Sequence, residues 1–294
     1  MRKWTLFALV TGLALVVSSA WASTPPVVID YLTGNIISGP GVIGGTPWIA
    51  NGSGEWWDNN SSDPQQSVPS PHTKLNIGGV LVGGVTTTGS GFNPTKLANP
   101  PGVIPFLHDS VSGVGTAVTN WVFQDGPSVG VLRLEFAGHR GVNEFGIYKA
   151  GDPTTKKVLF TGSDSPVKTA TFSPLADVGS TQFGLYMNYQ NLTFYSESRF
   201  NSYTGTKPGW WDDATEKGYQ HFALFKGAIN PYGFVQWWIG VEDLGKGENL
   251  NERGGPGVGD YQDMVLTLEA IPDASTLALF LSGLPALALL RRRK

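Results

Sequence analysis

Two short acidic segments near the end of the chain carry the residue types best suited to metal chemistry. One segment follows the apolar run Phe234–Val241, the other precedes the apolar run Met264–Glu269, and a glycine-rich loop separates them. Calcium takes about six to eight oxygen ligands at flexible angles, from carboxylates, amides, backbone carbonyls and water. The candidate ligands are Glu242, Asp243, Asp260, Gln262 and Asp263. The pattern therefore predicts a Ca²⁺ site that orders this segment.

The two apolar runs are expected to form strands, with the acidic groups gathered at one end of a sheet. Close carboxylates repel one another unless a cation neutralises them. A second interpretation stays open, because acids at strand ends also cap turns and keep loops soluble. The spacing is not that of an EF-hand loop, which needs oxygen ligands at alternate positions and a closing glutamate.

Tryptophan occurs in three adjacent pairs, and two of them lie beside acids. These two pairs are Trp56-Trp57, within Glu55–Asp58, and Trp210-Trp211, followed by Asp212 and Asp213. An indole stacked on a sugar, with a carboxylate that accepts from its hydroxyls, would hold a polysaccharide. The alternative is that such loop aromatics plug the end of a core. The third pair, Trp237-Trp238, is expected to lie in a strand and to contribute to the core.

Catalysis finds little support in the sequence, and we expect no enzyme. The chain lacks a Gly-x-Ser-x-Gly elbow and a His-Glu-x-x-His pair. Its four histidines are His72, His108, His139 and His221. Glu135 and Glu144, on runs expected to be adjacent strands, could form a glycosidase pair, since that chemistry needs two carboxylates roughly 5 to 10 Å apart. Surface acids on strands are the simpler interpretation.

The elements that must position these residues are short and rich in β-branched and aromatic residues, as strands are. Leu132 to Phe136 alternates apolar and polar residues, which is typical of a strand with one buried face. The predicted strands are Val27–Leu32, Val80–Thr87, Ala117–Gln124, Val129–Phe136, Glu144–Tyr148, Lys157–Phe160, Val167–Phe172, Gln182–Asn188, Leu192–Tyr195, His221–Phe225, Phe234–Val241 and Met264–Glu269. They predict an all-β chain, with one jelly-roll-like β-sandwich over residues 23–271.

The first 22 residues have the features of a secretory signal peptide. Arg2 and Lys3 precede an apolar core from Leu6 to Val17, and Ala20 and Ala22 supply small residues before a cut at Ser23. The core, at about 12 residues, is too short for a spanning helix, which needs roughly 20. The sequence therefore predicts an exported protein.

The last 23 residues have the features of a second targeting signal, which consists of three parts. Pro272, Asp273 and Ala274 begin a polar motif, an apolar run extends from Leu277 to Leu290, and a basic cluster ends the chain. The cluster consists of Arg291, Arg292, Arg293 and Lys294. It is expected to stay cytoplasmic by the positive-inside rule. The run has about 14 residues, which favours a temporary inner-membrane helix over a permanent anchor.

This tail resembles the PEP-CTERM sorting tail of Gram-negative envelope proteins, with Asp273-Ala274 where the family has Glu-Pro. The resemblance implies an exosortase-like processing enzyme as a partner. It also implies a transient inner-membrane intermediate and delivery to the outer envelope or to the exopolysaccharide matrix of a biofilm.

The segment from Gln182 to Ile271 resembles a family of secreted bacterial β-sandwich proteins. Its signature is a Glu-Asp step, a glycine-rich loop and an Asp-Tyr-Asn-Asp step before an apolar strand. Glu242-Asp243 and Asp260–Asp263 match this signature, with Gln262 in place of asparagine. The resemblance implies an extracellular, calcium-binding β domain without a catalytic role.

The amino-acid composition limits the classes of molecule that the exported chain can bind. Without the six cations of the leader and tail and without Asp273, 14 basic and 22 acidic residues remain, a net charge of −8. A negative surface argues against nucleic acid as a partner. The chain has no cysteine, so thiol chemistry and disulfide staples are excluded and stability must come from the core or a bound metal. A structural or adhesive role is expected, with carbohydrate binding through the tryptophan pairs as the alternative.

Overall fold

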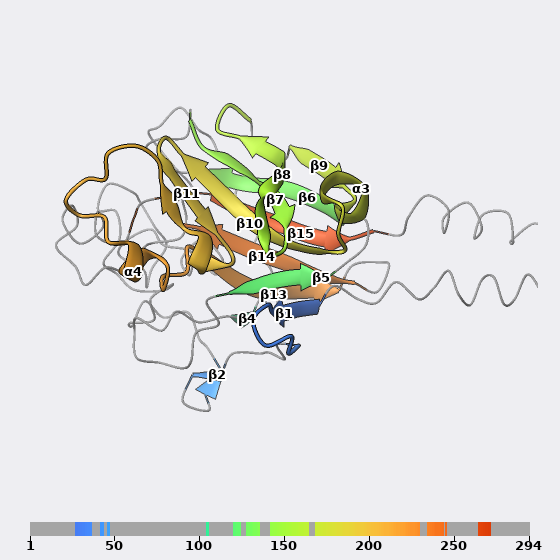
Figure 1. Cartoon of the computed structure of the whole chain (residues 1–294). Helices are drawn as coiled ribbons and strands as arrows, with labels where there is room; N and C mark the ends of the chain where they lie inside the picture. Colours follow the sequence, from blue (N-terminus) through green and yellow to red (C-terminus); the bar gives the residue numbers. More distant parts are fainter. Residues whose placement is uncertain are drawn as a thin grey trace, which may run out of the picture.

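The computed structural model of the chain describes residues 27–36, 42–43, 46–47, 104–105, 120–124, 128–135, 142–164, 168–229, 234–243, 245 and 264–271. These residues form mainly antiparallel β-sheets with a few short helical turns (Figure 1). The prediction of an all-β chain is therefore confirmed over the described part.

The larger sheet has seven described strands. In chain order they are β1 (Val27–Asp30), β5 (Trp121–Gln124), β7 (Glu144–Lys149), β8 (Asp152–Thr161), β10 (Gln182–Tyr189), β11 (Leu192–Tyr195) and β12 (Ser202–Tyr203). Strand β10 is central: β7 pairs along one side of it, and β5 and β11 pair with its two halves on the other. Strands β8, β1 and β12 lie beyond β7, β5 and β11 respectively.

The second sheet has six described strands in the order β4-β13-β14-β15-β6-β9. Their bounds are β4 (Ile104–Pro105), β6 (Ser128–Glu135), β9 (Thr169–Phe172), β13 (Phe222–Ile229), β14 (Val235–Val241) and β15 (Met264–Ala270). A separate two-stranded pair joins β2 (Val42–Ile43) to β3 (Thr46–Pro47). All pairings in both larger sheets are antiparallel.

The two larger sheets share one hydrophobic core. Trp121 and Phe123 of β5 approach Phe222 and Trp237 of the second sheet, with ring centroids 6.5 and 5.7 Å apart. Phe145 of β7 also meets Phe222, at 6.4 Å. In β14, Trp237 and the next two odd-numbered positions belong to this core, as the two-residue period of a strand requires. The two sheets thus pack face to face across aromatic side chains.

Helical structure is limited to short turns in the described residues. These turns are α3 (Pro174–Val178), the 3-10 turn η2 (Ser198–Phe200) and α4 (Asp213–Glu216). Gly179 ends α3 in the left-handed conformation, at φ 72°. None of the described helices is long and apolar enough to cross a membrane.

Most strand predictions that fall on described residues are confirmed within a few positions, whereas Val80–Thr87 lies outside them. The larger difference is β8, which begins at Asp152 rather than Lys157. Gly151, at φ 77°, allows a tight reversal directly after β7, so the polar residues that follow pair as an edge strand. Trp237 and Trp238 are both buried, at 3% and 6% exposure, so both faces of β14 are covered.

One expectation about neighbouring strands is wrong. Glu135 and Glu144 were expected on adjacent strands, yet β6 belongs to the six-stranded sheet and β7 to the seven-stranded sheet. The chain crosses from one sheet to the other between them, a change that a local pattern does not reveal. Glu144 accepts a hydrogen bond from the Tyr186 hydroxyl at 2.8 Å. The pairing on which the glycosidase interpretation relied is therefore absent.

Candidate cation site at the end of strand β14

Strand β14 ends beside the start of β15. Val241 lies opposite Met264, and Met264 lies opposite Glu135 of β6 on its other side. The end of β14 and the start of β15 therefore lie at the same end of the six-stranded sheet. This confirms the strand arrangement from which the acidic cluster was predicted. Of the predicted ligands, Glu242 and Asp243 are described, whereas Asp260, Gln262 and Asp263 lie outside the described residues.

Both described carboxylates are buried. Glu242 has 0% and Asp243 2% of its surface exposed. Removing a carboxylate from water costs several kcal/mol unless donors or positive charge replace its hydration. Solvated acids that merely cap a turn would stay exposed. Burial therefore favours a compensated, structured end of the sheet over a solvated turn.

Asp243 bonds across to the other sheet. The Nδ2 atom of Asn143 donates to Asp243 Oδ2 at 3.0 Å. Asn143 immediately precedes β7 and is itself 2% exposed. The backbone fixes its position, because Gly162 N donates to the Asn143 carbonyl at 2.7 Å. A polar contact between the two sheets therefore closes this end of the core.

His221 links the end of β14 to α4. Its ring stacks on Phe194 of β11, with centroids 3.5 Å apart and planes at 11°. Its Nε2 lies 3.3 Å from Glu216 Oε2, and its Nδ1 lies 3.2 Å from the Glu242 carbonyl. The ladder with β13 also continues here, since Glu242 N donates to the His221 carbonyl at 3.0 Å. His221 is thus a buried part of the framework, as expected for a strand residue packed against the sheet.

Local hydrogen bonds hold the turn that carries Glu216. Asp212 caps α4 by accepting from Ala214 N and Thr215 N, both at 3.2 Å. The Thr215 hydroxyl also donates to Asp212, and this bond is the largest cause of the lowered pKa of Asp212. The pKa of Asp213 is lowered as well, first by Lys207 and then by the indole of Trp211. The two ionised acids at the start of the turn suit the positive end of a helix.

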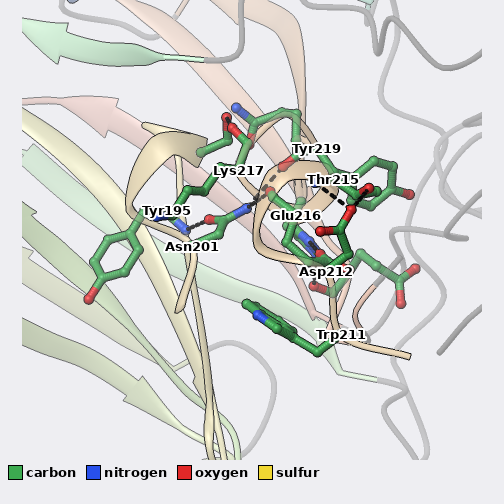
Figure 2. Close-up of polar contacts among 12 residues, drawn as sticks. Tyr195, Asn201, Trp211, Asp212, Thr215, Glu216, Lys217 and Tyr219 are labelled. Atoms are coloured by element: carbon green, nitrogen blue, oxygen red, sulfur yellow. Dashed lines mark hydrogen bonds and ion pairs between the residues drawn. The ribbon is translucent and has the colours of Figure 1, made fainter. Parts of the chain in front are cut away.

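Asn201 fixes the far side of the same turn (Figure 2). Its Oδ1 accepts from Tyr195 N at 2.8 Å, and its Nδ2 donates to the carbonyls of Glu216 and Tyr219 at 2.8 and 3.0 Å. Ser198 adds a bond from its hydroxyl to the Lys217 carbonyl at 2.7 Å. The α4 turn is therefore tied to β11, and the position of Glu216 beside His221 follows from it.

The pair Trp210-Trp211 lies next to this end, near Gly245. Trp211 is buried at 7% exposure in the shared core, and its Nε1 donates to Asp213 Oδ1 at 2.9 Å. Trp210 is half-buried and packs edge-on against Tyr203 at 6.1 Å. A Cβ atom on Gly245 would lie 2.6 Å from Trp210 Cζ3, so only glycine allows this close approach. The burial of Trp211 favours its role as a plug of the core end over a sugar contact.

The remaining predicted site residues lie outside the described part of the chain. They are Trp56 and Trp57, the signal positions Ala20 and Ala22, and the tail positions Pro272, Asp273, Ala274, Arg291, Arg292 and Arg293. Two members of the buried end were not predicted, namely Asn143 and Glu216. The place of Asn143 directly before the predicted strand 144–148 was only a weak indication that it belongs to the site. Glu216 lies in a four-residue helix too short to leave a periodic pattern.

Within the described residues, no three His, Asp or Glu side chains are grouped closely enough to hold a metal ion by themselves. Comparisons with known sequence families, with curated proteins and with solved structures found no match to this chain. What the end of β14 supplies is a set of buried oxygen atoms from carboxylates and an amide, beside a glycine-rich segment. Such a set is suited to a hard cation.

Proposed function

We propose that this chain is an exported structural or adhesive protein of the bacterial envelope or exopolysaccharide matrix. Its ends act as a signal peptide and as a sorting tail read by an exosortase-like enzyme, with a transient stay in the inner membrane. The body between them is a jelly-roll-like β-sandwich, and calcium orders its acidic end. The function is mechanical or adhesive and involves no catalysis.

One observation carries this proposal, namely the burial of Glu242 and Asp243 where β14 ends and β15 begins. These carboxylates precede a glycine-rich segment of sequence that Asp260 and Asp263 follow, and the backbone carbonyls of such a segment can turn inward to complete a coordination shell. Because the chain has no cysteine, a bound ion would take the place that disulfides hold in many secreted proteins.

Thermal unfolding of the full chain, purified in mild detergent, tests the calcium part. An ion that binds only the native state stabilises it by about 2.7 kcal/mol at a hundredfold excess over its dissociation constant. We expect the unfolding midpoint to rise by several degrees when calcium replaces a chelator. The rise should disappear in a variant with Asp260→Ala and Asp263→Ala. Superimposed curves for the wild type would contradict calcium binding.

Fractionation of a Gram-negative host with an exosortase tests the sorting part. The full chain should leave the inner membrane for the outer envelope or matrix. A chain in which Arg291, Arg292 and Arg293 are replaced by glutamine should lose orientation and sorting. Identical distributions of the two chains would show that the tail does not sort the protein, and they would not bear on calcium binding.

Carbohydrate binding is the second candidate, and the half-exposed ring of Trp210 favours it. The ring packs against Trp211, whose indole donates to Asp213, and the Asp213 carboxylate could also accept from sugar hydroxyls. Retention of the protein on matrix polysaccharide should then fall in Trp210→Ala, and in Trp56→Ala or Trp57→Ala if the first pair contributes. Retention that depends on calcium but not on these residues would favour the structural role.

A further inference from the structure

Asn143 has a buried amide oxygen with no partner among the described residues. Its Oδ1 atom is enclosed by protein and accepts no hydrogen bond from the described residues, while its Nδ2 atom donates to Asp243. Buried polar atoms in native proteins are almost always paired, so an unpaired amide oxygen requires a physical reason. The strand start holds this side chain in place through the Asn143 carbonyl, so the group is fixed where it stands.

The orientation of the amide follows from its neighbour. Asp243 is a carboxylate and can only accept when ionised, so the nitrogen of the Asn143 amide must face it. The amide oxygen is bonded to the same carbon and therefore points away from that hydrogen bond, yet stays beside the carboxylate. One side of this polar contact thus presents an amide oxygen next to a carboxylate. Both atoms are electron-rich, and both are shielded from bulk water.

Electron-rich oxygens side by side attract a positive charge or a hydrogen-bond donor. A hard divalent cation fits best, because carboxylate and amide oxygens are the ligands that calcium selects and because calcium tolerates irregular angles. Glu242, fully buried one position earlier, adds further negative charge at the same strand end. The neutral amide lowers the repulsion that a third carboxylate would cause.

We infer that Asn143 Oδ1 and the Asp243 carboxylate are ligands of one calcium ion that clamps the two sheets together. This inference rests on the proposed function and deepens it, because it moves the site from one loop to the contact between the sheets. Asn143 comes from the start of β7 in the seven-stranded sheet, and Asp243 follows β14 of the six-stranded sheet. Calcium then holds the two layers together at this end of the core.

Terbium, a hard cation that substitutes for calcium, gives a direct test on the full chain in mild detergent. Trp210 packs against Gly245, two positions after Asp243, so excitation of tryptophan should sensitise terbium bound here. Competition with calcium then reports calcium affinity. Asn143→Ala should weaken that affinity about tenfold or more, since even residues that only support a ligand contribute that much. Asn120→Ala, at another buried strand start, is the matched control and should bind like the wild type.

A second variant, Asn143→Asp, distinguishes an Asn143 that binds calcium from an Asn143 that only contacts a buried water molecule. It remains informative if Asn143→Ala fails to fold. An aspartate at this position faces Asp243, so the two carboxylates repel each other until calcium binds both. Its unfolding midpoint should therefore depend more steeply on calcium than that of the wild type. A midpoint lowered equally with calcium and with chelator would overturn the inference.

The other possible results of these measurements separate the role of Asn143 from calcium binding as such. If Asn143→Ala keeps the calcium affinity of the wild type, then Asn143 is not a ligand, while calcium binding at the acidic end stands. If the wild type itself binds neither terbium nor calcium, the inference and the calcium part of the proposed function fall together. The sorting proposal is independent of both results.

Discussion

Asn201 illustrates what a single buried side chain does in this protein, because it pairs one backbone N–H and two carbonyls. Asn201→Ala leaves these three groups without their partner and should lower the free energy of unfolding by about 3 kcal/mol. Urea denaturation measures the loss. Asn188→Ala, which removes one bond from the Thr193 hydroxyl at a half-buried site, should cost less than about 1 kcal/mol. Equal losses would contradict the role given to Asn201.

Gln190 is a strained residue in the hairpin between β10 and β11. Tyr189 lies opposite Leu192, so Gln190 and Asn191 form the whole turn, and Gln190 adopts φ 49°. A side chain disfavours this left-handed conformation, whereas glycine does not. Gln190→Gly should therefore stabilise the protein by about 0.5 to 1 kcal/mol in urea denaturation. Gln190→Ala keeps the strain and should give no gain. A loss of stability on Gln190→Gly would show that the turn is not strained.

The acidic pair after β14 could be predicted from the sequence only in part. Glu242 and Asp243 were predictable as a pair, because their residue types and their place after an apolar run are visible in the sequence. Their burial was not, because it depends on elements far along the chain. Asn143 is 100 positions from Asp243, and no local pattern connects the two.

At the scale of elements, the α4 turn depends on the charge of its cap. Hydrogen bonds from Thr215 and Ala214 lower the pKa of Asp212 below its ordinary value of 3.8. A lowered pKa in the folded state means that the cap contributes stability above the ordinary value and that this contribution is lost as the pH falls through the lowered one. Asp212→Asn keeps an acceptor at the cap but cannot titrate.

Acid unfolding measures this effect. Below the ordinary aspartate value, the wild type should lose stability more steeply with falling pH than Asp212→Asn does. At neutral pH the two should differ little, whereas Asp212→Ala should be less stable than either because the cap is gone. Parallel pH profiles for the wild type and Asp212→Asn would contradict the assignment of the cap.

The pairing of β7 with β10 depends on a glycine beneath an aromatic ring. Tyr148 lies opposite Gly184, and a Cβ atom on Gly184 would come within 2.3 Å of the ring. The Tyr148 hydroxyl donates to the buried carboxylate of Glu197 at 2.9 Å, so the ring cannot move without breaking that bond. Gly184→Ala should therefore cost about 1 to 3 kcal/mol.

A matched substitution makes this prediction specific. Gly209 has open space where a Cβ atom would be placed, so Gly209→Ala should be close to neutral. Chemical denaturation of both variants decides the matter. If Gly184→Ala unfolds at the same denaturant concentration as the wild type, the strand pair tolerates a side chain and the close contact is not a constraint.

The sequence predicted the positions of individual strands better than it predicted side-chain burial or the sheet that each strand joins. Alternating apolar side chains indicated β10 within one position, and an apolar run with β-branched residues indicated β15 equally well. The polar start of β8 was missed because edge strands need no apolar residues there. The sheet that each strand joins was not predictable for β6 and β7, because a crossing between sheets leaves no local signal.

At the scale of the whole molecule, two antiparallel sheets share one aromatic core and meet at an acidic end. The core supplies the hydrophobic stabilisation, and polar contacts such as Asn143–Asp243 close its end. Without cysteine, the chain has no covalent link between its layers. A cation held by both sheets would supply a link that works in an oxidising or a reducing environment.

Calorimetric titration of calcium into the full chain measures directly whether the end of β14 binds the ion. We expect one saturable site per chain, with an affinity weakened about tenfold or more in Asp243→Asn, which keeps the size of the side chain but loses its charge. Asp213→Asn, at an exposed acid that Lys207 already neutralises, should titrate like the wild type. The absence of saturable binding, or binding that Asp243→Asn leaves unchanged, would contradict a calcium site at the end of β14.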